Sequence, residues 1–275
     1  MTTPAERNRA WWEERAALHG HDGVFYDIDG FVAGDDAISE RELAELEAAV
    51  GELARTRVLH LQCHLGLGTL SLARRGAVVT GLDFSPTAVA KAREVAARAG
   101  LAATFVLADV HALPDELVGG FDAVFASYGV IMWSPSMGAW MRSAARALVP
   151  GGALVLVDGH PIAMMVRSSD PPRLDGPYLG ATPVERVDRG SYTDPDAATV
   201  HDDTVLYRHG LGEIVTAAAA AGLVVEAITE FMDEPDDGHA TPDDRFGRSV
   251  DGRVRMPFAG ADLPVQFSLR ARKPR

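Results

Sequence analysis

The sequence predicts an α/β fold in which a mainly parallel sheet carries helices on both faces. From Thr56 onward, short apolar runs typical of strands alternate with helical patterns. Helix boundary signals stand between them, such as Ser85 followed by Pro86 at one helix start and Gly100 at its end. Strands that alternate with helices pair in parallel, and the crossing helices cover both sides of the sheet.

Length and composition fit one large α/β domain with a modest appendage. The chain has 275 residues, of which 47% are hydrophobic and 24% charged, as in ordinary globular proteins. No apolar run is long enough to cross a bilayer, and the charged N-terminus does not resemble a secretory signal. Cys63 is the only cysteine, which excludes intrachain disulfides and a cysteine-rich metal site. We expect a cytoplasmic protein without a membrane partner, and we assign no metal.

The formal net charge of −13 argues against a nucleic-acid partner. Binding to a phosphate backbone needs a basic surface that neutralises it. We therefore expect the partner to be a small molecule, and a homodimer is compatible with the sequence.

The first fifty residues predict two helices. Residues 4–18 form a short helix, and Ser39 with Glu42 has the spacing of a capping box at the start of the second. The glycine-rich stretch between them predicts a loop. We expect residues 1–50 to form a helical lid segment and residues 51–275 the main domain.

In the first half of the main domain, the sequence pattern predicts five strands. In order, the strands are RVLHLQ, AVVTGLD, ATFVLAD, FDAVFAS and ALVLVDG, and the helices between them span residues 66–75, 86–99 and 137–148.

Regular structure is expected to lapse over residues 160–208, where six prolines make long helices unlikely. A long irregular stretch in a compact domain is typically functional or disordered, and we interpret this one as a substrate-covering insertion. The helix GLGEIVTAAAAAG and the strand LVVEAITEF follow it. After a Pro/Asp/Gly-rich excursion, LPVQFSLRARK predicts the last strand.

The segment VLHLQCHLGLGTLSLARRGA has the strand–turn–helix form of a nucleotide site at a first βα crossover. Gly66 and Gly68 would let a ligand approach the backbone. A dinucleotide fingerprint also needs a third glycine, where Ser71 stands, so an ordinary tight turn explains this pair about as well.

Acidic residues end the second and third strands. The carboxylate of Asp83 can accept both hydroxyl groups of an adenosine ribose, and Asp109 can accept from an exocyclic amine such as adenine N6. The carboxyl ends of parallel strands form the edge where ligands bind. Each residue could instead belong only to the turn that follows its strand.

Together these stretches resemble the class I S-adenosylmethionine (SAM)-dependent methyltransferases. Over residues 56–161 the family's motifs occur in order, as VLHLQCHLGLGT, VTGLDFSPTAVAKAR, FVLADVHALP, FDAVFASYGVIMW and LVPGGALVLVDGHP. The resemblance implies a Rossmann-like, seven-stranded sheet whose last strand runs antiparallel between the fifth and sixth. It also implies SAM as the methyl donor and S-adenosylhomocysteine as the product.

The resemblance also implies which positions contact SAM. The turn after the first strand would lie under the methionine part, and the second strand's end would hold the ribose and adenine. The third strand's end would contact the adenine edge, and the fourth would line the transfer face. The residues at these positions are Gln62, Cys63, His64, Gly66, Asp83, Phe84, Asp109, Val110, Ser127 and Tyr128.

The glycine-rich turn departs from the family pattern, which reads acidic-x-Gly-x-Gly-x-Gly. The aligned residues here are His60, Gln62, His64 and Gly66, and only the last matches. The turn is similar to that of a bacterial subgroup with an HLQCH motif. Side chains at Gln62 and His64 would crowd a pyrophosphate, but they could hydrogen-bond the amine and carboxylate of SAM.

Acceptor-site residues are harder to assign. His160, just after the fifth strand, is the candidate general base or acceptor-orienting group, and a structural histidine is the alternative. Five further residues could contact the acceptor, although core packing, capping or lid closure would explain them as well: Trp12, Tyr26, Trp133, Tyr178 and His209.

We therefore expect a methyltransferase that moves a methyl group to an O or N atom of a small molecule. The displacement is in-line on an activated donor, so positioning and water exclusion supply most of the catalysis. One alternative is a protein that binds SAM without methylating, as a sensor or for other SAM-using chemistry. The other is an NAD(P)-dependent oxidoreductase.

Overall fold

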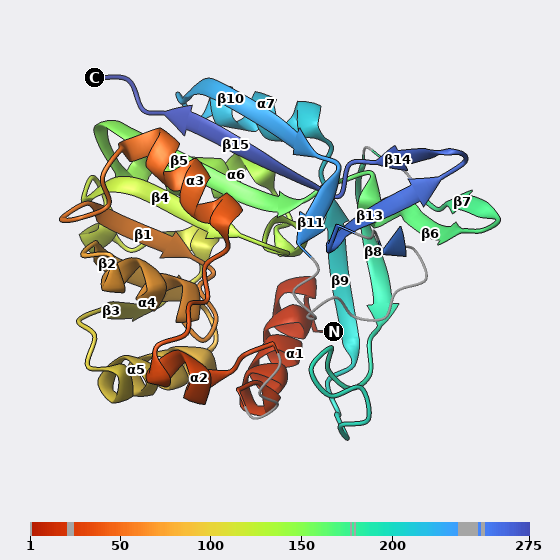
Figure 1. The fold of residues 1–275 in the computed structure, drawn as a ribbon, viewed down its shortest axis with the longest axis horizontal. Coiled ribbons are helices and arrows are strands. Elements are labelled where there is room, and N and C mark those ends of the chain that lie inside the picture. The colour runs from red at the N-terminus through yellow and green to blue at the C-terminus, as the bar shows by residue number, and fades with distance from the viewer. Residues whose placement is uncertain (1, 21–24, 177, 179, 236–246, 249–250) are drawn as a thin grey trace.

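A computed structural model describes residues 2–20, 25–176, 178, 180–235, 247–248 and 251–275. Its centre is a seven-stranded sheet in the order β10-β15-β5-β4-β1-β2-β3 (Figure 1). The strand β15 runs antiparallel to both β10 and β5, whereas the remaining neighbours are parallel. This confirms the expected Rossmann-like fold with its reversed last strand. The bounds are β1 (Arg57–Leu61), β2 (Val78–Asp83), β3 (Thr104–Leu107), β4 (Phe121–Ser127), β5 (Leu148–Gly159), β10 (Val224–Phe231) and β15 (Gln266–Arg272).

Helices cover both faces of this sheet. One face carries α3 (Glu40–Val50), α4 (Leu67–Arg74) and α5 (Pro86–Ala99), and the other carries α6 (Met137–Ala147) and α7 (Leu211–Ala220). Both expected starts are confirmed: Ser39 and Glu42 form a reciprocal capping box on α3, and the Ser85 hydroxyl accepts the Ala88 N–H of α5. Gly100 ends α5 in the left-handed conformation.

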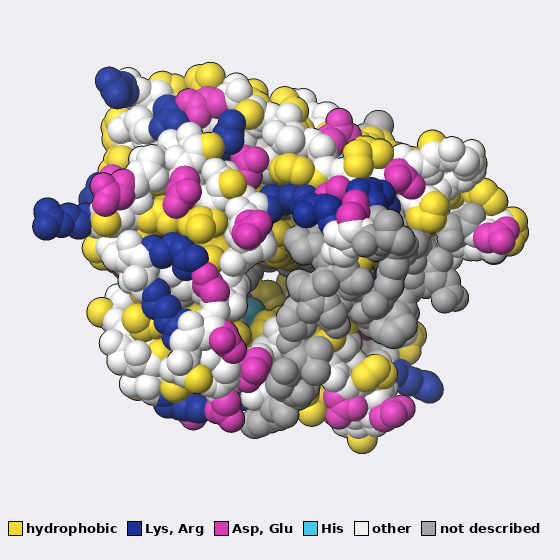
Figure 2. Space-filling model, viewed as in Figure 1, with side chains coloured by type: hydrophobic (Ala, Val, Ile, Leu, Met, Phe, Trp, Pro, Cys, Tyr) yellow, Lys and Arg dark blue, Asp and Glu magenta, His cyan; other side chains and the backbone are white. Residues whose placement is uncertain are grey.

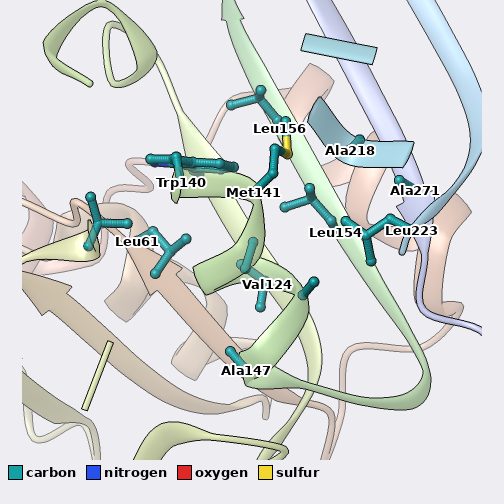
Figure 3. Packing of buried hydrophobic residues seen from close by; sticks show 14 of the residues in the cluster. Leu61, Val124, Trp140, Met141, Ala147, Leu154, Leu156, Ala218, Leu223 and Ala271 are labelled. Atoms are coloured by element: carbon teal, nitrogen blue, oxygen red, sulfur yellow. The ribbon is translucent and has the colours of Figure 1, made fainter. Parts of the chain in front are cut away.

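The central strands are buried on both sides. Leu59 and Leu61 of β1 point to one face of the sheet and belong to the cluster under α6. Val58 points to the opposite face and packs under α3. Figure 3 shows Trp140 and Met141 of α6 packed beside Leu154, Leu156 and Val124 of the sheet. Apolar residues on both strand faces explain the continuous hydrophobic runs in the sequence and hold the carboxyl edge of the sheet rigid.

The expectation of an irregular stretch over residues 160–208 was wrong. It contains two antiparallel strand pairs, β6 (Val166–Ser169) with β7 (Pro172–Leu174), and β8 (Gly180–Val187) with β9 (Asp203–Arg208). Prolines exclude helices here, but they are compatible with edge strands, and both strands of a two-stranded sheet are edges.

The segment before the last strand was also expected to be irregular. It contains a second small sheet of β11 (Asp233–Pro235), β12 (Gly247–Arg248), β13 (Arg253–Phe258) and β14 (Ala261–Leu263). Strands of two to six residues are too short to give a clear alternating pattern, which is why the sequence did not indicate them.

The described residues among the first fifty form three helices. The predicted α1 (Pro4–Leu18) lies beside β9 (Figure 1), where the Asn8 side chain exchanges two hydrogen bonds with the Val205 backbone, at 2.7 and 2.8 Å. A short helix, α2 (Ile28–Ala33), replaces part of the predicted loop, because the Asp27 side chain caps its first turn. No helix in the described part of the chain is long and apolar enough to span a bilayer.

Candidate functional site

A cavity of about 680 Å³ lies at the carboxyl ends of β1, β2 and β4. This is the edge where open α/β sheets bind ligands. Figure 2 shows a hollow near the centre of the molecular face that α2 and α3 border, with a histidine side chain visible inside it. Most of the residues expected to contact SAM, and three of those expected to contact the acceptor, line the cavity: Gln62, Cys63, His64, Asp83, Phe84, Ser127 and Tyr128, with Trp12, Tyr26 and Trp133.

The turn after β1 is held in an unusual backbone conformation. Gln62, His64 and Gly66 have positive φ angles of 55°, 49° and 74°, which residues other than glycine rarely adopt. The Gln62 side chain secures the turn, since its amide nitrogen donates to the Val130 carbonyl at 3.1 Å and its oxygen accepts from the Trp140 indole at 2.8 Å. Gln62 thus joins the turn to the end of β4 and to α6, and its contact with the amino-acid end of SAM stays a prediction.

Gly66 is the one member of the turn that must be glycine. It is the N-cap residue of α4, and a Cβ atom there would lie 2.6 Å from the Phe105 ring and 3.0 Å from the Ala92 side chain. It is not among the residues that line the cavity. In this structure Gly66 admits close packing of α4 against α5 and β3.

Asp83 ends β2 with its carboxylate at the cavity wall. One carboxylate oxygen accepts the His64 N–H and the other the Ser85 N–H, both at 2.9 Å. Burial raises the pKa of Asp83, although these N–H groups oppose the rise. Each carboxylate oxygen can accept a second hydrogen bond, so the position fits the expected contact with ribose hydroxyls.

Asp109 and Val110 lie after β3, outside the lining of this cavity. The Asp109 carboxylate caps a 3₁₀ turn (Val110–Ala112), accepting the His111 N–H at 2.8 Å and bonding the His111 ring at 2.9 Å. The His111 ring holds the pKa of Asp109 below its usual range. The geometry matches the turn role that the sequence left open, and an adenine contact stays a prediction.

Aromatic side chains and His64 line one end of the cavity, and His19 supports His64 from outside the lining. His19 bonds His64 through their ring nitrogens at 2.7 Å, and its other nitrogen bonds the Ser191 hydroxyl at 2.8 Å. Burial lowers the pKa of His19 to about 3 and that of His64 well below its usual value, so both rings are neutral. Trp12 packs on His64, with ring centroids 5.4 Å apart. The sequence gave no signal for His19, because only the tertiary fold brings residues 19, 64 and 191 together.

Carboxylates dominate the charge of the cavity. Among the described residues, the lining contains no lysine or arginine. Burial lowers the pKa of His60 to about 3, so this histidine, which replaces the family's acidic residue, carries no charge at neutral pH. The acidic lining residues are Asp27, Asp35, Asp36, Glu42 and Asp83. Such a wall favours a cationic ligand and repels phosphates.

Glu42 is a lining residue that the sequence indicated only as part of a capping box. Its side chain accepts the Ser39 N–H at 2.7 Å and is 4% exposed. Burial raises its pKa, and hydrogen bonds from Ser127 and Ser39 oppose the rise. In the sequence, the acidic pair at residues 35–36 and the capping glutamate at position 42 stand close to one another. That these side chains line a cavity became apparent only because α3 packs beside β4.

A second cavity, of about 530 Å³, adjoins the first, and Tyr128 and Gly129 line both. Its walls come from the ends of β4 and β5 and from strands of the 160–208 segment. His209 lines it, with its Nε2 atom donating to the Ser134 carbonyl at 2.8 Å and Nδ1 lying 3.1 Å from Glu213.

The other two candidate acceptor residues lie elsewhere. His160 lines neither cavity: its Nδ1 accepts the Ile162 N–H at 3.1 Å and its Nε2 bonds Glu230 at 2.9 Å. Both ring nitrogens are therefore used, as in the structural alternative, and a catalytic role stays a prediction. The Tyr178 hydroxyl accepts the Leu211 N–H at 3.4 Å at the start of α7, and Tyr178 is absent from both linings.

A seven-stranded sheet in this order, with the reversed strand β15 between β10 and β5, has the topology of the class I SAM-dependent methyltransferase fold. Residues 58–152 match a family described as the methyltransferase domain. Domains of this class take SAM as their methyl donor. The narrower subgroup with the HLQCH turn stays a prediction.

Several known methyltransferases are similar in sequence to part of this chain. A ubiquinone biosynthesis O-methyltransferase from Xanthomonas oryzae pv. oryzae is 34% identical over 132 residues, 48% of this chain and 54% of that protein. A ribosomal RNA small subunit methyltransferase C from Chromohalobacter salexigens is 35% identical over 157 residues, 54% of this chain and 44% of that protein. The chain thus spans about half the length of these relatives.

Similarity in structure extends further along the chain. A SAM-dependent methyltransferase from Mesorhizobium loti superposes with a TM-score of 0.56 at 22% identity, covering 88% of this chain and all of that one. At this identity the likeness establishes the shared fold.

Proposed function

We propose that this chain transfers the methyl group of SAM to an O or N atom of a small molecule. The observation that carries the proposal is a cavity at the carboxyl edge of a methyltransferase-type sheet, joined to a second cavity at Tyr128. Its described lining has five carboxyl groups and no lysine or arginine. The first cavity suits a donor and the second an acceptor.

The lining residues fit SAM better than a dinucleotide. SAM, when bound, supplies a methyl group on a positively charged sulfonium, and it also carries an ammonium group. Asp83 would hold the ribose hydroxyls, and the carboxyl group of Glu42, whose pKa is raised by burial, lies in the same lining at the end of β4. An NAD(P) pyrophosphate would instead face these carboxylates without a cation to pair it.

The chain's own residues would contribute orientation and water exclusion. Trp12, Tyr26 and Trp133 line the first cavity, and the neutral ring of His64 lies in its wall, bonded from behind by His19. A fixed approach of acceptor to donor can supply effective molarities of about 10⁵–10⁸ M. The proposal therefore needs no catalytic dyad. The strand pairs of residues 160–208 would serve as the cover of the acceptor.

Isothermal titration separates the candidate cofactors. We expect one SAM to bind per chain at pH 7.5 and NADPH to give no heat, because its phosphates meet the acidic wall. The absence of SAM binding at millimolar concentration would overturn the proposal. NADPH binding in its place would favour the oxidoreductase.

Turnover separates a methyltransferase from a protein that binds SAM without methylating. With SAM and the small-molecule fraction of a bacterial extract, we expect release of S-adenosylhomocysteine and a product heavier by one CH₂ unit, measured by mass spectrometry. Tight SAM binding with no such product across fractionated extracts would favour the non-methylating alternative.

A further inference from the structure

We propose that the carboxyl group of Glu42 is the charge partner of the donor's sulfonium, so that the first cavity binds SAM in preference to S-adenosylhomocysteine. The inference depends on the proposed function and gives one residue of the donor cavity a specific task. The two ligands differ in one methyl group and in the positive charge on sulfur. A carboxylate close to the sulfur therefore distinguishes the donor from the product.

The position of the sulfur follows from the place where the two cavities meet. Tyr128 and Gly129 line both of them. In an in-line displacement the acceptor atom, the methyl carbon and the sulfur lie on one line, and the reacting atoms must be about 3–3.5 Å apart. With the donor in the first cavity and an acceptor in the second, the methyl group would lie at the boundary that these two residues form.

The boundary has a fixed conformation. The Asp158 carboxylate at the end of β5 accepts the N–H groups of Gly129 at 2.5 Å and Val130 at 3.1 Å. Tyr128, just before them, has a positive φ of 48°. A residue other than glycine keeps such a conformation only where the surrounding structure holds it, so the boundary is a rigid part of the site.

Glu42 reaches this boundary from α3 through two neighbours. The Ser39 hydroxyl accepts the Glu42 N–H at 3.2 Å and bonds the Tyr128 hydroxyl at 2.9 Å. The Glu42 carboxyl group also hydrogen-bonds Ser127, which directly precedes Tyr128. Because Glu42 lines the first cavity as well, its carboxyl group lies in the donor cavity beside the residue that both cavities share.

A buried carboxyl group suits the recognition of a sulfonium. A sulfonium has no N–H or O–H group to donate, so opposite charge is a direct means of binding it. Glu42 is 4% exposed, and electrostatic attraction is stronger where water is excluded. Burial raises the pKa of Glu42, whereas a cation beside a carboxyl group favours its ionised form. Binding of SAM should therefore release the proton of any Glu42 that is still protonated.

Titratable groups from the neighbouring elements lie around Glu42. Besides burial, Asp36 in the segment before α3 raises the pKa of Glu42, and the pKa of Asp36 itself is lowered. At the end of β1, burial lowers the pKa of His60 to about 3. After β4, burial raises the pKa of Tyr128. None of these three groups changes its charge between pH 5.0 and 7.5.

Two further carboxyl groups have a pKa that burial raises, Asp83 at the end of β2 and Asp158 at the end of β5. Asp83 faces the part of the donor expected to be ribose, which both ligands contain, so its titration should change both affinities alike. Asp158 accepts backbone N–H groups of the boundary. Charged side chains on α3 and on the strand β15 that it packs against pair with groups other than Glu42: Arg41 with Asp233, and Arg270 with Glu45.

The charge on sulfur disappears in the reaction. Methyl transfer leaves the electron pair of the broken S–CH₃ bond on sulfur, while the acceptor gains the methyl group and releases its proton to solvent. The product S-adenosylhomocysteine is a neutral thioether, so its attraction to Glu42 ends. The site would then hold the product less tightly than the donor that replaces it.

Paired titrations with SAM and S-adenosylhomocysteine test the inference without an acceptor. Isothermal titration at pH 7.5 should give a dissociation constant at least tenfold lower for SAM. This ratio should fall as pH decreases to 5.0, because protonation of Glu42 removes its charge. In buffers of different ionisation enthalpy, SAM binding at the lower pH should release more protons than S-adenosylhomocysteine binding does.

Glu42→Gln should lower the affinity ratio at least fivefold and remove its pH dependence. Asp83→Asn is the matched control, because it alters another buried carboxyl group of the same cavity. It should weaken both ligands and leave their ratio unchanged. Glu47→Gln, at an exposed position of α3, should change neither affinity.

An unchanged ratio in Glu42→Gln, or equal wild-type affinities for the two ligands at every pH, would overturn the inference and leave the proposed function intact. If neither ligand binds, the proposed function fails and the inference fails with it. If Glu42→Gln does not fold, the wild-type ratio across pH and the difference in proton release still decide.

Discussion

The carboxylate of Asp83 accepts backbone N–H groups from both His64 and Ser85 while it faces the first cavity. It therefore fixes the turn after β1 in addition to any contact with a ligand. Its neighbour Glu13 caps α5 by accepting the Thr87 N–H at 3.2 Å. The buried carboxylate of Asp83 thus links the end of β2 to the turn that follows β1.

Asp83→Asn should raise the dissociation constant of SAM at least tenfold. The amide keeps the shape but removes the charge and one acceptor, and hydrogen bonds to charged groups contribute roughly 1.5–3 kcal/mol. Isothermal titration measures the change, with circular dichroism to verify folding. Asp122→Asn is the control, because Asp122 pairs with Arg57 at the opposite edge of the sheet. An unchanged dissociation constant would remove Asp83 from the donor site.

Glu42→Gln should stabilise the fold and weaken SAM binding. Burial raises the folded-state pKa of Glu42 above its ordinary 4.5, so the ionised side chain destabilises the folded protein as pH rises through and above that value. The amide removes this cost. We expect Tm to rise by roughly 2–4 °C at pH 7.5, as about 1 kcal/mol would give, with the gain absent below pH 4.5.

Thermal unfolding across pH, together with SAM titration, measures both effects. The exposed residue Glu47, on the same helix, gives the control Glu47→Gln. A Glu42→Gln protein that is less stable at pH 7.5, or one that binds SAM as tightly as the wild type, would contradict the assignment of a buried charge at the donor site.

At the scale of elements, α1 is attached to the segment of residues 188–202. Arg15 is fully buried, and its guanidinium donates to the carbonyls of Gly190 at 2.9 Å, His201 at 2.6 Å and Asp188 at 2.8 Å. Because α1 also carries Trp12 and leads to His19, this attachment positions one wall of the first cavity.

Arg15→Met should lower stability by about 3–5 kcal/mol, because it leaves buried carbonyls and the Asp202 carboxylate without their donor. SAM binding should weaken as well, since Trp12 loses its support. Chemical denaturation and SAM titration measure the two effects. Arg57→Met is the control: its partly exposed pair with Asp122 should contribute only about 0–1 kcal/mol. If Arg15→Met and Arg57→Met lowered the free energy of unfolding and the SAM affinity equally, the role given to α1 would be contradicted.

On the scale of the whole molecule, charge is distributed unevenly. The chain carries 39 acidic and 26 basic residues, and in the described lining of the first cavity the charged side chains are all acidic apart from histidines. A negatively charged molecule repels polyphosphate partners. This pattern favours a small acceptor over ribosomal RNA, although one relative bears the name of an RNA methyltransferase.

Filter binding with a 16S ribosomal RNA fragment tests whether the acidic surface excludes RNA as a partner. We expect no retention below about 10⁻⁴ M protein at 0.15 M salt, the weak limit of nonspecific nucleic-acid binding. Submicromolar binding that weakens steeply with added salt would contradict a small-molecule acceptor.

The sequence by itself determined the central sheet, its helices and the acidic residue at the end of the second strand. Apolar strands, helix caps at Ser39 and Ser85, and the acid at Asp83 depend on neighbours within a few residues, so local pattern was enough. Short strands between residues 160 and 263 were missed, because most of them are too short to give a clear alternating pattern.

Only the tertiary structure decided which side chains share a cavity. His19 meets His64 across 45 residues, and Arg167 meets Arg208 at Asp175, pairings that no local spacing encodes. It also placed Glu42 at the first cavity and left both ring nitrogens of His160 bonded outside the two cavities. Secondary structure follows largely from nearby residues, whereas a site with its charge follows from long-range packing.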